Sequence, residues 1–519
     1  MRNRYLNSRP PRALAGAGAI GAALAALALP MLVYLLTMAP TITWAHDGAD
    51  GGDLITAAYT LGVPHPPGYP VYCLLGWLFA HLPLRDVAWR LNLMSAVGAG
   101  LAALGLYAAV MEWTQGRHEP GGDAAIAGLG AAWGLAFVPV LWSQALIAEV
   151  YALHAACVAW TLWLALRVRH ARACPEPAEG AWPGALGLAW GLSLSTHLTS
   201  LALLPVVMWA GCPSRLAPAA QQRERLFRSV LLPTLLGVML GLSPYIYLSW
   251  RAGRGAVTWG DPTTLAGWWW VASGALYRGY LLSLPLQAIP ARVLALVQHT
   301  GEGFGPTGIV LGAVGVESLA RQHRALLLAS GLSTLLVVAY AIGYDTADSY
   351  VYLIPAFVIF AFWLGVGLAE GLGWLRSRLG GYRRLAAAVG LACAGPLFAL
   401  VLNYRGMDVH QDAAARDFAA GVLAAAPRQA VLLSARDAHT FTLWYYQHVV
   451  GQRPDLAIVD TGLWEYDWYR AGLRRAYPGL VVAEGDVADY GPRELGRANP
   501  TRPLCELVGE EELKCTQSE

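Results

Sequence analysis

Long apolar runs, separated by short segments that carry arginine, dominate the sequence. The first run extends from about Ala13 to Met38, follows four arginines, and is longer than the apolar core of a signal peptide. A helix needs about 20 consecutive apolar residues to cross a bilayer. Only 13% of the residues are charged, against about 25% in an average soluble domain. The sequence therefore predicts a mainly α, polytopic helical membrane protein.

The positions of the arginines predict which loops face the cytoplasm, because cytoplasmic loops are enriched in Lys and Arg. We expect the first run to be an uncleaved span whose N-terminal end lies inside. The run from Ala185 to Gly211 obeys the rule only as a hairpin of two short spans that bends near His197. An odd number of spans then places the C-terminal part outside. The eleven predicted spans are 13–38, 88–112, 123–141, 145–166, two within 185–211, 229–250, 303–320, 325–343, 350–372 and 385–403.

Two domains are predicted, a membrane domain at 1–403 with a first outer loop at 39–87, and an extracytoplasmic domain at 404–519. In the second, 430–433 and 456–459 are typical of short buried strands, and 440–450 and 466–476 of helices, which predicts a small α/β unit. Loops at the carboxyl ends of parallel strands tend to face ligands, here 436–439 and 460–462. The alternative is a cap that only packs on the membrane domain. Cys505 and Cys515 can pair if this domain lies in an oxidising compartment.

Three acids follow the first apolar run closely, Asp47, Asp50 and Asp53. Gly51 and Gly52 disfavour one continuous helix through all three. Asp53 can be the N-cap of a helix that starts there, accepting backbone N–H groups. Asp50 has no such structural explanation. A carboxylate on a glycine-flanked loop can approach a substrate and act as a general base, an effect of about 10²- to 10⁴-fold in rate.

Further polar side chains are expected at the outer ends of the spans. The proline-rich segment from His65 to Pro70 is stiff, and His65 either binds substrate or is a hydrogen-bonded structural histidine. Glu149 is an ionisable residue near membrane depth, which makes it a functional candidate, with a hydrogen bond to a neighbouring helix as the alternative. Arginine suits a phosphate, but at the end of a span it can equally reach the lipid headgroups. The candidate substrate-binding residues are His65, Tyr69, Gln144, Glu149, His197, Arg251, Asp261, Arg278 and Asp345.

Several segments of the membrane part share a pattern with a known family. The most specific block is Gly48 to Ala58, followed by Leu61 to Pro70, and weaker matches occur at 142–145, 148–153, 191–194, 197–199, 259–262 and 344–355. These segments resemble a membrane family long called a domain of unknown function, whose animal member is a protein O-mannosyltransferase. The family often has Asp-Ser-Gly-Glu where this chain has Asp50-Gly51-Gly52-Asp53. The shorter Asp53 side chain is expected to change a contact while it keeps the charge.

That family looks like a member of the GT-C superfamily of integral-membrane glycosyltransferases, which take their sugar from a polyprenyl-phosphate donor. An acid in the first outer loop is the catalytic base of that superfamily, so the resemblance implies this role for Asp50, with Asp53 nearby. We expect Asp50 to take the proton of an acceptor hydroxyl, while arginine and His197 hold the departing polyprenyl phosphate. No cofactor is expected. Three acids in one loop can hold a divalent ion, but a mechanism without metal is favoured.

The expected function is transfer of a mannose-like sugar to a hydroxyl of a protein or glycan at the outer face of a membrane. Lys514 is the only lysine, which suggests a GC-rich genome and a bacterial inner membrane. The expected partners are membrane lipid, the lipid-linked donor and the acceptor, and the net charge of +2 gives no reason to expect nucleic acid. The alternatives are a transporter or flippase of a lipid-linked sugar, and a non-catalytic membrane assembly factor.

Overall fold

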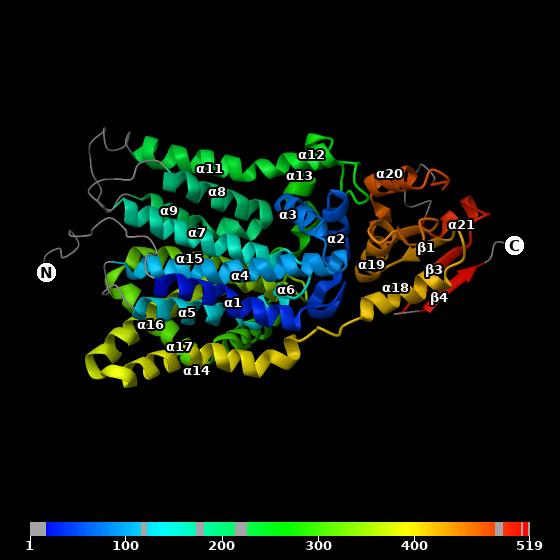
Figure 1. Cartoon of the computed structure of the whole chain (residues 1–519). Helices are drawn as coiled ribbons and strands as arrows, with labels where there is room; N and C mark the ends of the chain where they lie inside the picture. The colour runs from blue at the N-terminus through cyan, green and yellow to red at the C-terminus, as the bar shows by residue number, and fades with distance from the viewer. Residues whose placement is uncertain are drawn as a thin grey trace.

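The structure is a computed structural model that describes residues 17–115, 122–172, 181–212, 226–482, 491–509 and 512–516. A bundle of apolar helices carries a small α/β domain at one end (Figure 1). Within the described ranges, eight helices are long and apolar enough to cross a membrane, or nine if one bent pair counts as a span. The predicted polytopic helical protein with a small C-terminal α/β domain is confirmed.

The candidate spans follow the predicted order. The bent pair is α5 (Gly122–Ala136) and α6 (Pro139–Ala145), which meet at 71°. Two predicted spans are shorter than the others, α8 (Ala181–Thr196) and the pair η2 (Leu198–Leu203) and α9 (Leu204–Gly211). The longer spans are α1 (Ala17–Thr37), α4 (Val87–Thr114), α7 (Tyr151–Ala171), the series η3 (Phe227–Leu231), α11 (Leu232–Leu242), η4 (Ser243–Tyr245) and α12 (Ile246–Arg251), then α14 (Ile289–Gln322), α15 (Arg324–Gly343), α16 (Ile354–Arg378) and α17 (Gly381–Met407).

The start of α14 differs from the prediction. The sequence predicted that this span starts at 303, after a long outer segment, whereas the helix begins at Ile289. Gly305, with φ of 62°, and Pro306 interrupt the apolar pattern. In the structure they kink the helix without ending it, so the outer segment is shorter than predicted.

The predicted hairpin near His197 is confirmed by contacts at the far end of the bundle. Helix α8 ends at Thr196, and η2 begins two residues later. Beyond the end of α7, the Arg172 guanidinium donates to the carbonyl oxygens of Ala210 and Gly211, at 3.0 and 2.8 Å. The end of α9 therefore lies beside the end of α7, and the chain has turned back on itself. Of the arginines used in that prediction, those at 215, 223 and 225 lie outside the described residues.

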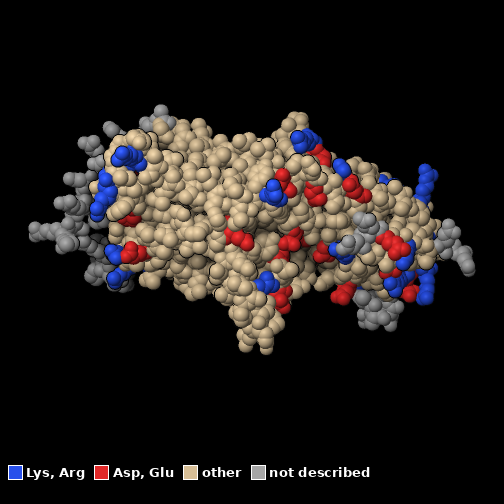
Figure 2. Space-filling view, turned by 90° about the horizontal axis from the view of Figure 1, so that it is seen from below, with Lys and Arg blue, Asp and Glu red and all other residues tan. Residues whose placement is uncertain are grey.

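Charged side chains gather at the two ends of the molecule and leave a largely uncharged band between them (Figure 2). At the end away from the α/β domain, Glu112 pairs with Arg167 at 3.3 Å, and Asp123 pairs with Arg376 at 2.9 Å. A band of this kind is what the hydrocarbon core of a bilayer requires, because charge there is costly. The acidic first loop and the α/β domain lie together at the opposite end (Figure 1).

The α/β domain is built on a four-stranded sheet of order β2-β1-β3-β4. Strand β1 (Val431–Ser434) is parallel to β2 (Ala457–Asp460) and β3 (Leu504–Val508), and β4 (Glu512–Thr516) is antiparallel to β3. Cys505 and Cys515 face each other across β3 and β4 and form a disulfide. The domain's helices are α18 (Ala414–Ala425), α19 (Asp437–His448), α20 (Asp467–Ala476), α21 (Glu494–Ala498) and η8 (Leu463–Glu465).

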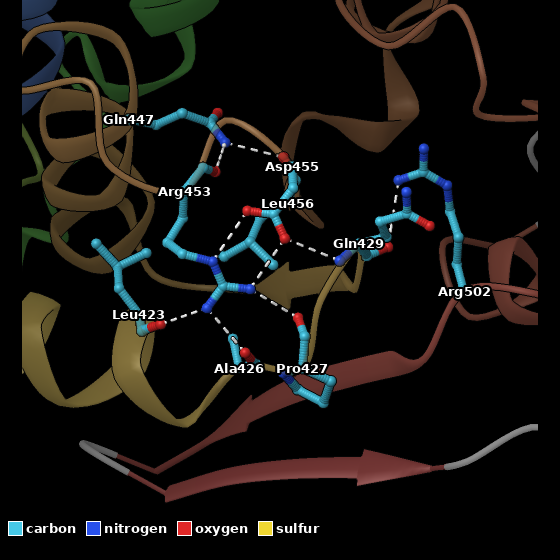
Figure 3. Close-up of polar contacts among 9 residues, drawn as sticks. All are labelled: Leu423, Ala426, Pro427, Gln429, Gln447, Arg453, Asp455, Leu456 and Arg502. Carbon is cyan, nitrogen blue, oxygen red and sulfur yellow. Dashed lines mark hydrogen bonds and ion pairs between the residues drawn. The ribbon is translucent and has the colours of Figure 1, made fainter.

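Arg453 joins several parts of this domain (Figure 3). Its guanidinium pairs with Asp455 at 2.9 Å and donates to the carbonyl oxygens of Ala426 and Pro427, both at 2.8 Å. Asp455 also accepts a hydrogen bond from the backbone N–H of Gln429 at 2.9 Å. The loop before β2 is thereby fixed to the end of α18 and the approach to β1.

The α/β domain is docked on the first loop through α2 (Gly51–Thr60). A Cβ at Gly52 would lie 2.2 Å from the carbonyl oxygen of Phe441 in α19, so only glycine allows this approach. The indole of Trp44 donates to Thr442 Oγ1 at 2.9 Å. The remaining elements at this end are η1 (Ala45–Asp50), α3 (Pro70–Ala80), α13 (Leu265–Ala272), η5 (Ala275–Tyr280), η6 (Leu286–Ala288) and η7 (Ser349–Leu353).

Candidate active site

Asp53 is fully buried in the first turn of α2 and accepts three hydrogen bonds. The donors are the backbone N–H of His65 at 2.9 Å, Nδ1 of the same histidine at 2.7 Å, and Nε1 of Trp259 at 3.0 Å. The N-cap interpretation of Asp53 is therefore wrong, because its side chain points to the segment after α2 and not to its own first turn. The N-cap position is held by Asp50, whose side chain makes no capping bond.

His65 lies between two carboxylates. Its Nδ1 faces Asp53, and its Nε2 lies 3.7 Å from Oδ2 of Asp50. The His65 side chain is 7% exposed, whereas that of Asp50 is 45% exposed. Asp53, His65 and Asp50 thus form a line from a buried anchor to an accessible carboxylate, which we call the Asp53–His65–Asp50 array.

The electrostatics of the array favour a charged pair. Burial alone would lower the pKa of His65, but the carboxylates of Asp50 and Asp53 outweigh it and raise the pKa to about 9. The pKa of Asp50 is raised, first because the surrounding protein limits its hydration, while His65 opposes this change. Near neutral pH we therefore expect an imidazolium at His65, ready to stabilise the carboxylate form of Asp50.

The third acid of the loop points elsewhere. Oδ2 of Asp47 accepts a hydrogen bond from the Tyr350 hydroxyl at 2.7 Å. His46 and Asp47 have φ of 56° and 61°, so the chain leaves the helical path before α2 begins. No group of three or more His, Cys, Asp or Glu side chains in the described residues is arranged to hold a metal ion. The three acids do not converge on one point, because Asp53 is already bonded to His65 and Trp259.

Gln144 lies in the last turn of α6, and Glu149 lies on the segment between α6 and α7. Glu149 is 6% exposed, and burial, followed by the nearby charge of Asp50, raises its pKa well above the ordinary value. Gln144 Nε2 donates to the carbonyl oxygen of His46 at 3.4 Å, and this hydrogen bond links α6 to the first loop. Glu149 therefore belongs to the electrostatic surroundings of the array, and Gln144 is placed to position the loop.

Aromatic rings extend from the array toward the spans. The ring of His65 lies 5.1 Å from that of Tyr69, and the ring of Tyr69 stacks at 6.4 Å on that of His197. Tyr151 and Tyr352 lie 5.5 and 5.6 Å from His197. The structure thus brings together Tyr69 and His197, which the sequence analysis selected, with two tyrosines that it did not.

Tyr277 was also missed, although its ring lies 6.3 Å from that of His65. Tyrosines near span ends are expected as interfacial anchors, so sequence position alone did not mark Tyr151, Tyr277 or Tyr352 as site residues. All three tyrosines lie beside polar segments that the sequence had already indicated, and this position is the one feature that could have identified them as site residues.

Four other predicted residues make local contacts. Arg251 donates to the carbonyl oxygen of Leu61 at 2.7 Å and so holds the end of α2. Asp261 accepts from the backbone N–H of Thr263, and Arg278 donates to Ser273 Oγ at 2.6 Å. The backbone N–H of Asp345 donates to the carbonyl oxygen of Tyr280 at 3.1 Å and joins two outer turns.

Arg292 was not selected from the sequence, yet it reaches one of these turns. It donates to Ser349 Oγ at 2.8 Å and to the carbonyl oxygen of Thr346 at 2.6 Å. Asp348, in the same turn, raises the pKa of Asp50 after burial and Asp53. The predicted span began at 303, which left Arg292 in a loop, whereas α14 begins at Ile289 and includes this residue.

The fold of the chain is shared with two solved structures of ArnT. ArnT from Cupriavidus metallidurans bound to undecaprenyl phosphate superposes with a TM-score of 0.55 at 14% identity, over 86% of this chain and 92% of ArnT. The apo structure of that ArnT gives 0.55 at 13% identity, over 94% and 93% of the two chains.

The sequence itself matches the models of one family. The model described as the protein O-mannosyl-transferase TMEM260 N-terminal domain matches residues 50–215, and TMEM260-associated domain 2 matches 415–479. Protein O-mannosyl-transferase TMEM260 of Mus musculus is 29% identical over 89% of this chain, and that of Dictyostelium discoideum is 23% identical over 85%. Both matches point to similarity with TMEM260 proteins, and the chain spans 66% and 57% of the length of these two relatives.

Proposed function

We propose that the chain transfers a mannose-like sugar from a polyprenyl-phosphate donor to a hydroxyl of a protein or glycan acceptor. The observation that carries the proposal is the Asp53–His65–Asp50 array, which presents one accessible carboxylate at the start of α2. The names of the relatives support mannosyl transfer to protein. The undecaprenyl phosphate bound to ArnT, which has the same fold, supports a lipid-linked donor.

In the proposed reaction, Asp50 is the general base. It accepts the proton of the acceptor hydroxyl while that oxygen forms a bond to the anomeric carbon of the sugar. The bond between the anomeric carbon and the phosphate oxygen breaks, and its electron pair leaves with the polyprenyl phosphate. The leaving group needs no proton, so one base is sufficient.

His65 and Asp53 act through Asp50 and are positioning residues. Asp53 fixes the orientation of the imidazole, and the imidazolium keeps Asp50 ionised despite its limited hydration. His197 and the tyrosines around it provide hydrogen-bonding groups on the path from the array toward the spans, where a lipid-linked substrate would lie. Arginine as the phosphate ligand remains a prediction, and Arg292 and Arg278 are the candidates to test.

We place the array on the extracytoplasmic side, with the N-terminus in the cytoplasm of a bacterium and the spans in its inner membrane. Two features support this orientation. The opposite end of the bundle carries arginines, as cytoplasmic ends do. The α/β domain beside the array has a disulfide, and disulfides persist in oxidising compartments.

We propose that the transfer step uses no divalent ion. The imidazolium of His65 takes the place that a cation would have beside Asp50, and the oxygens of Asp53 are already bonded. Addition of EDTA to the purified protein is the direct test. The proposal fails if the chelator abolishes transfer and a divalent ion restores it.

Asp50→Asn tests the proposal most directly, with Asp47→Asn as the matched control in the same loop. Both substitutions remove one acid from the loop, but only the first removes the proposed base. In proteoliposomes with a lipid-linked mannose, Asp50→Asn should lower the transfer rate by about 10²-fold or more, and Asp47→Asn should keep most of it. Transfer by folded Asp50→Asn at the wild-type rate would refute the mechanism. Movement of the donor across the bilayer without any glycosylated product would indicate the flippase alternative.

A further inference from the structure

A cavity of about 340 Å³ lies between the membrane domain and the α/β domain. On the membrane side its wall is the segment 253–259, which follows α12. On the other side it is lined by residues of α19, of β2 and of α20. We call it the interdomain pocket. Its volume is within the range of small-molecule sites in proteins.

Aromatic rings form much of the pocket lining, and they include Trp259, Trp444, Trp468, Tyr469 and Tyr477. The rings of Trp259 and Trp468 lie 5.7 Å apart at an angle of 36°, so two flat surfaces are adjacent. Together they offer broad apolar faces in a space that also contains polar groups, which is the usual composition of a specific ligand site.

Three polar groups lie at the pocket, and two of them, Arg475 and His448, are open to a ligand. Nε1 of Trp468 is buried and has no hydrogen-bond partner among the described residues. A buried N–H without a partner costs free energy, but this nitrogen has almost no accessible surface, so the indole meets the pocket through its ring and not through its N–H. Arg475 is exposed and has no ion-pair partner in the described part of the chain.

The third group, His448, is neutral near pH 7 because burial lowers its pKa to about 4. A neutral imidazole has one donor and one acceptor nitrogen. A hydroxyl can satisfy both kinds of group, whereas a carboxylate can only accept.

The pocket is also connected to the candidate active site. Trp259 lines the pocket, and its Nε1 donates to Asp53 at 3.0 Å. One indole therefore separates a ligand in the pocket from the anchor of the array. A ligand that moved Trp259 would change the hydrogen bonding of Asp53.

We propose that the interdomain pocket binds one pyranose ring of a glycan carried by the acceptor or the product. The apolar face of the ring would lie on the indoles, and its hydroxyls would meet His448 and Arg475. The choice of mannose as the first probe rests on the proposed function, but binding itself needs no transfer chemistry.

Binding of methyl α-mannopyranoside to the purified full chain, measured by calorimetry and saturation-transfer NMR, tests the proposal. Gly472 of α20 lines the pocket, and a Cβ there meets nothing within 4 Å, so Gly472→Leu should fill the space without a backbone clash. Gly421 of α18 is equally open but does not line the pocket, and Gly421→Leu is the matched control. Trp468→Phe keeps an aromatic ring but replaces the two-ring indole with a smaller phenyl face and removes the N–H.

The wild type and Gly421→Leu should bind the sugar saturably, and Gly472→Leu should weaken binding by at least about tenfold. Trp468→Phe should weaken it less, and if Gly472→Leu does not fold, Trp468→Phe and Arg475→Gln decide the question. Asp50→Asn should abolish transfer but leave this binding unchanged, which separates the two proposals. The inference is overturned if the wild type does not bind the sugar, if Gly472→Leu binds as well as Gly421→Leu, or if the pocket prefers N-acetylglutamate amide to the sugar.

Discussion

Asp53→Asn should move the alkaline limit of transfer activity toward neutral pH. In the wild type, Asp53 accepts three hydrogen bonds, two of them from His65, and its charge helps to raise the pKa of that histidine from 6.5 to about 9. The difference between these pKa values corresponds to roughly 3 kcal/mol in favour of the imidazolium. Asparagine keeps one acceptor oxygen, adds two N–H donors and carries no charge.

The direction of the effect follows from the protonation state that the mechanism needs. Transfer requires Asp50 ionised and His65 protonated, so the rate should rise with pH through the pKa of Asp50 and fall through that of His65. Without the carboxylate at 53, the burial that lowers the pKa of His65 is opposed mainly by Asp50. We expect the alkaline limb of the profile to move down by at least about one pH unit, so that the rate falls by about fivefold at pH 9 and far less at pH 7.

The assay is the initial rate of mannose transfer in proteoliposomes between pH 5 and pH 10, with donor and acceptor above their KM values. Trp259→Phe is a useful companion, because it removes one neutral donor to Asp53 and leaves the carboxylate in place. It should lower the rate without moving the alkaline limb as far. An alkaline limb that is identical in wild type and folded Asp53→Asn would refute the assignment of that limb to His65.

Three other measurements test the docking of the α/β domain, the stability of that domain, and the proposal that transfer needs no divalent ion. Gly52→Ala should cost about 1–3 kcal/mol in the free energy of unfolding, because the new Cβ would lie 2.2 Å from the Phe441 carbonyl oxygen, and Gly421→Ala should not destabilise the protein. The hydrogen bond from Arg453 holds the pKa of Asp455 well below its usual range. This pair therefore adds stability above about pH 4 and loses it as the pH falls further, and the melting temperature of Asp455→Asn should depend less on pH there. EDTA should leave the initial rate of transfer unchanged.

The parts of the fold that depend on local sequence were predictable. Hydropathy over windows of about 20 residues and the bias of arginine to one side are properties of each segment alone. They were sufficient for the polytopic helical class and for the turn at His197. They placed the start of α14 too late, because Gly305 and Pro306 look like the end of a helix when the packing around them is unknown.

The candidate site depends on contacts between distant segments, and only one of its members, Asp50, had a clear role from sequence reasoning. Asp50 was chosen because no structural explanation was available for it. The role of Asp53 was open, since an acid in the first turn of a helix is often a cap. Its true partners are a histidine 12 positions away and an indole 206 positions away. A local sequence pattern predicts neither of these contacts, because the partners are separated along the chain.

Helix α2 explains why the two family matches fall on such separate parts of the chain. It carries Asp53 in its first turn, and its Gly52 lies against the backbone of α19. The match at 50–215 begins at α2, and the match at 415–479 includes α19. A shift of α19 would move α2, and with it the carboxylate that orients His65. The α/β domain is therefore part of the frame that positions the proposed base, so its removal should disturb the pH profile of transfer as well as any binding in the interdomain pocket.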